Sequence, residues 1–163
     1  MVEAKVRGPM VSPGYWQDQA ATDAGITDGY LHTGDLGHMD SQGWFFVVDR
    51  LKDIINASGF KVSPREVEDV LCDHDAVLEA AVVGVPDEYR GETVKAYVCL
   101  RPGTTTTPEA LVEHCRERLA AYKYPRSLEI VDELPKTASG KILRRHLRVA
   151  PPPPARGDRA DAP

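Results

Sequence analysis

The chain has 163 residues, a formal net charge of -5, 42% hydrophobic residues and 28% charged residues, a balance typical of ordinary globular proteins. It lacks both an apolar run of about 18 residues that could cross a membrane and the apolar core of a signal peptide at its start, so we expect a cytoplasmic protein without a membrane span. An acidic chain without interleaved aromatic and basic residues also makes nucleic acid an unlikely class of partner.

Three cysteines, Cys72, Cys99 and Cys115, are odd in number, widely spaced and set in apolar patterns. This arrangement favours reduced thiols in the core over a disulfide framework. The five histidines are scattered without the spacing of metal ligands. We therefore expect no metal site built by this chain.

The first third of the chain is predicted to be rich in β-structure. Residues 2–7 indicate a short strand, 20–24 a helical turn, and 30–37 a strand edge broken by two glycines. A turn then leads into an aromatic and β-branched strand at 44–49, the composition that strands favour. This region holds too few apolar residues to close a core by itself.

A second pattern begins after a charged junction. Two short strands, 54–56 and 60–62, flank a hairpin turn. Ser63 then has the character of a helix N-cap, Pro64 suits the first helical position, and Glu66 completes a capping box. The sequence thus predicts a β-hairpin followed directly by a helix.

The remaining elements alternate between strands and helices. Residues 77–85 are almost continuously apolar, as in a strand buried on both faces, whereas 93–100 alternate, so we expect one polar side there. Thr107 caps a second helix, and 127–131 form a third strand. The order predicts an α+β fold class: a compact domain with a small mixed β-sheet, a β-hairpin and flanking helices.

The division of the chain follows from these patterns and from its last residues. We expect a β-rich part at 1–49, a compact domain at 50–149 and a disordered or polyproline-like tail at 150–163. The tail contains four consecutive prolines and few apolar residues. It cannot bury a core.

A cluster of cations near the end of the chain is the first candidate for a binding site. The run 136–148 contains five Lys/Arg and no Asp/Glu, while 1–49 contain two Lys/Arg and seven Asp/Glu. One interpretation is a solvated basic turn before a short helix; the other is a partner carrying phosphate or carboxylate. The Ser-Gly-Lys at 139–141 is not a P-loop, because Pro135 replaces the first glycine and Ile142 replaces the Ser/Thr.

Three other places carry residue types suited to a nucleotide site. Asp35, flanked by glycine, either forms a turn or accepts hydrogen bonds from a ribose diol. Arg50 lies in a charged stretch that is either a plain linker or an interdomain hinge with a phosphate-facing arginine. Ser58 and Gly59 either turn the hairpin or allow close backbone approach to an extended ligand.

Three ordered motifs resemble those of the adenylate-forming enzymes, the superfamily of acyl-CoA synthetases, peptide-synthetase adenylation domains and firefly luciferase. They are Tyr-Leu-His-Thr-Gly-Asp at 30–35, Val-Asp-Arg-Leu-Lys-Asp-Ile-Ile at 48–55 with Ser-Gly at 58–59, and Pro-Lys-Thr-Ala-Ser-Gly-Lys at 135–141. The stretch 82–98 is most similar to bacterial fatty-acyl-CoA ligases. The resemblance covers about residues 2–149.

This resemblance implies a ligase that works in two steps with ATP and Mg²⁺ bound to it, a carboxylic acid, and CoA as co-substrate. The acid and ATP give acyl-AMP and pyrophosphate, and CoA then displaces AMP. By analogy Asp35 holds the ribose hydroxyls of ATP or AMP, Arg50 contacts the nucleotide, and Lys52 stands at the hinge. Lys141 bridges the carboxylate and the α-phosphate.

The hairpin belongs to the second step in this analogy. Gly59, with Ser58, lines the channel for the pantetheine arm of CoA, and Lys61 lies near the CoA phosphates. One rotating domain then presents Lys141 for the first step and the hairpin for the second.

The same resemblance implies that much of a complete enzyme is missing. The Ser/Thr/Gly-rich phosphate loop, the adenine-binding segment and the acyl pocket do not occur in this sequence. We expect 1–49 to be the end of the large AMP-binding domain, so that the chain is a fragment, a misassigned start or half of a split gene, and is inactive alone. Two alternatives are a non-catalytic module that complements a separate N-terminal chain and the end of a peptide-synthetase adenylation domain.

Overall fold

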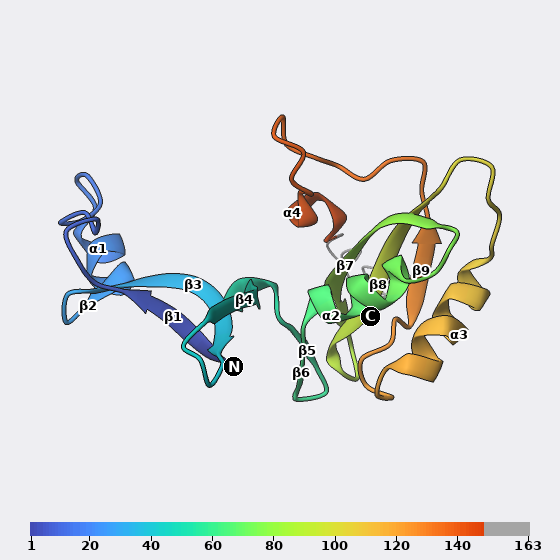
Figure 1. Ribbon diagram of the computed structural model, residues 1–163, viewed down its shortest axis with the longest axis horizontal. Helices are drawn as coiled ribbons and strands as arrows, with labels where there is room; N and C mark the ends of the chain where they lie inside the picture. Colours follow the sequence, from blue (N-terminus) through green and yellow to red (C-terminus); the bar gives the residue numbers. More distant parts are fainter. Residues whose placement is uncertain (149–163) are drawn as a thin grey trace, which may run out of the picture.

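The computed structural model describes residues 1–148; the predicted tail at 150–163 lies outside this part of the chain. Two β-sheets lie side by side (Figure 1), one built from the first fifty residues and one from the rest. They are joined by η1, a single 3₁₀ turn at Leu51–Asp53. The chain therefore changes from one sheet to the other at the charged junction.

The first sheet is antiparallel and centred on one long strand, β3 (Tyr30–Met39). Its partners are β1 (Val2–Val6), β2 (Ile26–Thr27) and β4 (Phe45–Arg50), and the short helix α1 (Gln19–Gly25) precedes β2. The prediction that glycines break the strand at 30–37 was wrong. β3 continues through Gly34 and Gly37, and a register shift against β4 between Leu36 and Gly37 absorbs the irregularity as a bulge.

Gly37 is required at this bulge because the neighbouring strand lies too close for a side chain. A Cβ atom there would lie 2.4 Å from the carbonyl oxygen of Phe46 and 2.5 Å from the Phe45 ring. Gly37 and Asp49 are the two buried residues of the first fifty, whereas Trp44 and Val47 are exposed. The prediction that this region closes no core is confirmed.

The second sheet is mixed, as predicted, with the strand order β6-β5-β8-β7. Its antiparallel strands are β5 (Ile55–Ala57), β6 (Phe60–Val62), β7 (Val77–Asp87) and β8 (Gly91–Leu100). β9 (Ser127–Ile130) runs parallel to β8. Two helices, α2 (Pro64–Cys72) and α3 (Pro108–Arg118), pack against this sheet, so the α+β fold class is confirmed.

Both helices begin at the predicted caps. The Ser63 side chain accepts from the amide of Glu66 at 3.5 Å, and Thr107 accepts from the amide of Ala110 at 3.2 Å. The capping box is corrected in one respect. Both carboxylate oxygens of Glu66 accept hydrogen bonds from Lys123 Nζ, at 2.6 and 2.8 Å, so this side chain connects α2 to the segment after α3.

The second sheet has a buried cluster of apolar side chains on each face. One lies under α2 and α3 and includes Val67, Leu71 and Leu111; the other lies beneath the last segment, which ends in α4 (Arg144–Leu147). The prediction of a polar side for 93–100 was wrong at Tyr97 and Cys99. Both are buried because Leu134 and Leu147 from that last segment cover this face.

The prediction that all three cysteines lie in the core holds for two of them. Cys99 and Cys115 are buried, but Cys72 is exposed at the end of α2. It follows Leu71 by one residue, about 100° around the helix from the buried stripe. All three thiols are free.

Candidate functional site

The lysine turn, defined here as Thr137–Lys141, is a small hairpin with an exposed tip. Lys136 and Ile142 form a β-bridge at its base, and the amide of Thr137 donates to the carbonyl of Lys141 at 2.8 Å. Gly140 has a φ of +82° and open space where a Cβ would lie, a conformation that glycine adopts at little cost. The Lys141 side chain therefore stands on a turn that can approach a ligand closely.

Asp35 and Arg50 are neighbours across the first sheet. They are directly paired in the register of β3 and β4, and Arg50 Nε donates to Asp35 Oδ1 at 3.1 Å. Arg50 is 47% and Asp35 29% exposed. Since the pair is accessible to solvent, its polar atoms remain available to a ligand.

Strand β1 shapes the backbone just before Asp35. Thr33 Oγ1 donates to the carbonyl of Ala4 at 2.7 Å and accepts from the amide of Asp35 at 3.1 Å. The Glu3 carboxylate lies 3.0 Å from His32 Nδ1 and accepts from the amide of Gly34 at 3.2 Å. The hydrogen bond with His32 lowers the pKa of Glu3. These contacts fix the segment from which Asp35 projects.

Asp49 connects the first sheet to the start of α2. This residue is 8% exposed, and its carboxylate accepts from Ser63 Oγ at 2.6 Å and from the amide of Arg65 at 3.3 Å. The N-terminus of a helix stabilises a carboxylate through its free amides and its dipole. From the sequence we interpreted Asp49 only as one of several charged residues in a linker. Its burial was not predicted.

Two clefts bring four of the predicted site residues together at the junction of the two sheets. A cleft of about 440 Å³ is lined by Arg50, Lys52 and Lys141, among others, and a smaller one of about 200 Å³ by Asp35, Arg50 and Lys141. The larger cleft contains six Lys/Arg side chains and one acidic side chain, Asp53. Such a cleft favours an anion that carries several charges.

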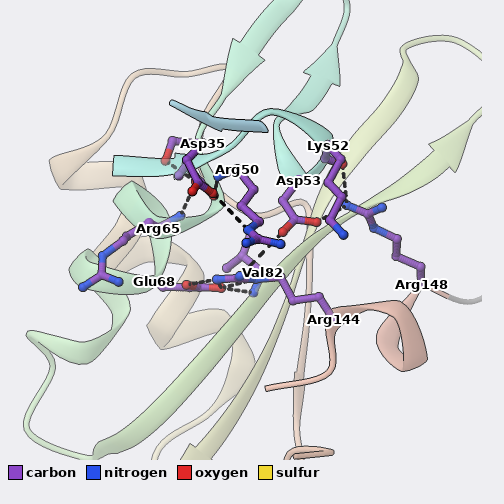
Figure 2. Close-up of polar contacts among 11 residues, drawn as sticks. Asp35, Arg50, Lys52, Asp53, Arg65, Glu68, Val82, Arg144 and Arg148 are labelled. Carbon is purple, nitrogen blue, oxygen red and sulfur yellow. Dashed lines mark hydrogen bonds and ion pairs between the residues drawn. The ribbon is translucent and has the colours of Figure 1, made fainter. Parts of the chain in front are cut away.

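Part of this positive charge is neutralised within the protein, as Figure 2 shows. Arg148 Nη2 donates to the carbonyl oxygen of Lys52 and to Asp53 Oδ1, each at 3.2 Å, and Arg144 lies against Glu68 and, more distantly, Asp53. Within residues 1–148, Lys141 has no carboxylate within ion-pair distance. Its charge is available to a ligand.

The three predicted CoA-contacting residues lie elsewhere, on the β5–β6 hairpin. Ser58 and Gly59 have φ values of 53° and +84°, and the amide of Ser58 donates to the carbonyl of Arg90 at 2.9 Å. The space beside Gly59 is open, and Lys61 is exposed. In Figure 1 this hairpin lies at the lower edge of the second sheet, whereas the segment leading to α4 runs along the top.

The fold and the clefts define a class: a two-part protein that joins a β-rich part to an α+β domain through one short turn and forms a cationic cleft where they meet. Within residues 1–148 no helix is long and apolar enough to cross a membrane. The same residues contain no cluster of His, Cys, Asp or Glu that could hold a metal ion.

Comparison with known proteins shows what the chain is similar to. Residues 66–141 match the AMP-binding enzyme C-terminal domain. The chain is 53% identical over 145 residues to a long-chain-fatty-acid–CoA ligase of Bacillus subtilis, covering 89% of this chain and 26% of that protein. It thus spans about a quarter of the length of this curated relative.

Solved structures agree with this match. ATP-bound MatB from Rhodopseudomonas palustris superposes with a TM-score of 0.85 at 35% identity, over 88% of this chain and 29% of that one. The o-succinylbenzoate CoA synthetase MenE from Bacillus subtilis, in complex with its acyl-adenylate, gives a TM-score of 0.80 at 40% identity, over 91% and 30%. The chain thus contains a match to the AMP-binding enzyme C-terminal domain, and it is similar to the C-terminal part of these ligases and synthetases.

Proposed function

We propose that this chain is the C-terminal part of an ATP-dependent acyl-CoA ligase. In the first step a carboxylate oxygen attacks the α-phosphorus of ATP, and the bond to the β-phosphate breaks to release pyrophosphate. In the second step the sulfur of CoA attacks the carbonyl carbon of acyl-AMP, and AMP leaves. The chain supplies nucleotide contacts and the lysine for the first step, and the hairpin for the second.

One observation carries this proposal: Asp35, Arg50 and Lys141 line one cleft although the first and the last are 106 positions apart in the sequence. Asp35 and Arg50 come from the first sheet, while Lys141 comes from the last segment of the second part. A carboxylate for ribose hydroxyls beside two cations for phosphates matches the polar groups of a nucleotide.

In the first step Lys141 acts on charge that develops during the reaction. A pentacoordinate α-phosphorus and the entering carboxylate both carry negative charge, and an ammonium aimed between them stabilises the transition state more than the ground state. Arg50 would contact the nucleotide phosphates, with Mg²⁺ arriving as part of MgATP. Asp35 would accept hydrogen bonds from the ribose.

The second step requires a different surface at the same cleft. Lys52 lies in a one-turn connection and is exposed, so rotation of its backbone dihedrals would turn the second part against the first. The β5–β6 hairpin would then face the cleft. Ser58 and Gly59 would border a narrow channel for the pantetheine arm, and Lys61 would contact a CoA phosphate.

We further propose that 1–49 and 50–149 belong to two different domains of the complete enzyme. The first sheet exposes Trp44, Phe45 and Phe46 by 68%, 44% and 47%. Apolar patches of this kind favour contact with another protein surface. The remainder of a large AMP-binding domain is the surface that this proposal places there.

The acid substrate is proposed to be a fatty acid, because the ligase from Bacillus subtilis that is named for long-chain fatty acids shares more than half of the aligned residues. Substrate selection itself depends on the acyl pocket. That pocket belongs to the part of the relatives that this chain does not span.

ATP–pyrophosphate exchange tests the proposal. The purified 163-residue chain should give no exchange with any fatty acid, and fusion to the N-terminal three quarters of the Bacillus subtilis relative should restore it. An Asp35→Ala fusion serves as the control for nucleotide binding and should lose exchange. Exchange by the isolated chain, or none by a folded fusion, would contradict the proposal.

A further inference from the structure

Both stems of the lysine turn are fixed by ion pairs to the second sheet and its helix. On the entering stem, Lys136 Nζ lies 2.8 Å from the carboxylate of Glu79 in β7. On the leaving stem, Arg144 makes a bidentate pair with Glu68 in α2, with distances of 2.6 to 3.1 Å. Lys141 lies between these two anchors.

Glu68 is itself held firmly. Its side chain is 12% exposed, and besides Arg144 its carboxylate accepts from the backbone amide of Val82 at 2.8 Å (Figure 2). Val82 belongs to β7, the edge strand of the sheet, whose outer amides need partners. One carboxylate therefore joins α2, the edge of the sheet and the last segment of the chain.

Among the described residues 1–148, the tip of the turn has no comparable anchor. Its hydrogen bonds run within the turn: Thr137 Oγ1 accepts from the amide of Lys141 at 3.1 Å and lies 2.8 Å from Ser139 Oγ. Lys141 and Arg144 are three positions apart in the sequence, a span of at most about 10 Å. The stems therefore decide where the Lys141 amine lies.

We propose that Glu68, acting through Arg144, is a positioning residue for Lys141, and that Glu79 supports the other stem through Lys136. This inference rests on the proposed function of Lys141 in adenylation. A bidentate, largely buried pair holds geometry far better than an exposed one. Glu68 should therefore matter more than Glu79, whose pair is 26% and 33% exposed.

The variant Glu68→Gln isolates this role. A glutamine oxygen still accepts from the Val82 amide, so the contact with the edge strand remains, while the charged bidentate pair with Arg144 is lost. Arg144→Lys removes the bidentate geometry from the other side and keeps the positive charge, because an ammonium has no planar fork. Glu113→Gln is the matched control, since Glu113 pairs with Arg116 on the exposed face of α3, at 57% and 62% exposure.

Amide hydrogen exchange on the full 163-residue chain gives the first readout. Glu68→Gln and Arg144→Lys should each accelerate exchange in 137–147 by about tenfold and leave α3 unchanged. Glu113→Gln should leave 137–147 unchanged. The inference would be overturned if neither Glu68→Gln nor Arg144→Lys altered exchange in 137–147, or if exchange accelerated equally throughout the chain.

Half-reaction kinetics on the fusion enzyme give the second readout. Glu68→Gln should lower the rate constant of adenylation about tenfold, leave the KM for ATP within about twofold, and leave thioester formation from supplied acyl-AMP unchanged. Added to Lys141→Ala it should cause no further loss, because the two residues act as one unit. A further tenfold loss in the double variant would contradict positioning through Lys141.

The two proposals fail in different ways. If Lys141→Ala leaves adenylation intact, the proposed function is wrong, while the exchange measurement still tests the anchoring of the turn. If Lys141→Ala abolishes adenylation but Glu68→Gln changes neither exchange nor rate, the proposed function stands and the positioning role is wrong.

Discussion

The two parts of this molecule handle apolar side chains in opposite ways. Every buried hydrophobic side chain of the described chain lies at Ile55 or beyond, and all but Ala76 belong to two clusters, one on each face of the second sheet. In the first fifty residues no large apolar side chain is buried, and Trp16 and Trp44 are 90% and 68% exposed. One part contains its own core, and the other is suited to complete a core with further protein.

This difference explains why the cleft lies at the junction. The core of the second part does not depend on the first sheet, and the proposed function uses this independence when it lets the second part rotate as a unit. The connection is short, and the contacts that hold the parts together include the hydrogen bond between Asp49 and Ser63. A domain with its own core and a polar junction suits the rotation that the proposed second step requires.

Separating the two parts should give the largest effect. Residues 51–148 alone should fold cooperatively, with a helical circular dichroism spectrum and dispersed amide resonances. Residues 1–50 alone should remain unfolded, because a sheet with no buried apolar side chain cannot offset its conformational entropy. A folded first part, or an unfolded second part, would contradict the claim that only the second part contains its own core.

Truncation of one side chain should lower the free energy of unfolding by about 3 kcal/mol more in the second part than in the first. Leu71→Ala opens a cavity beside the fully buried cluster under α2, which typically costs about 2–5 kcal/mol. Phe46→Ala, at a side chain that is 47% exposed, should change the free energy of unfolding by about 0.5 kcal/mol or less. Urea denaturation of both variants measures the difference, and equal losses would contradict it.

A smaller effect should appear in the reactivity of the cysteines. Burial raises the pKa of Cys115 to about 11 from its usual 9.0, so a thiol reagent at pH 8 should modify exposed Cys72 first and Cys115 last. Because the folded state keeps its proton to a higher pH, the free energy of unfolding should decrease as the pH rises from 9.0 toward 11. The Cys115→Ala variant should lose that part of the pH dependence, and rapid modification of Cys115 would indicate an open core.

Local patterns predicted most of the second part. Ser63 and Thr107 mark their helices because a cap depends on neighbours three residues away, and the apolar run at 77–85 marks a doubly covered strand. The polar side expected for 93–100 failed at Tyr97, which is covered by a residue 50 positions later. Periodicity describes one strand and carries no information on what will pack against it.

In the candidate site, too, residues within local motifs were predicted, and residues whose partners are distant in the sequence were missed. Ordered motifs indicated Asp35, Arg50 and Lys141, and the structure places these three around one cleft. Glu68 and Asp53 were missed as anchors because their partners lie 76 and 95 residues away in the sequence. An acidic residue on a helix or after a turn has the same local appearance whether or not it is paired.

The most direct test of the central proposal is the split between half-reactions in the Lys141→Ala variant of the fusion enzyme. Removal of an ammonium that stabilises developing charge should slow adenylation about 100-fold or more, while thioester formation from supplied acyl-AMP and CoA should stay within about threefold of the parent. This result would assign Lys141 to the first step alone. Equal losses in both steps, or full adenylation without the lysine, would contradict the account.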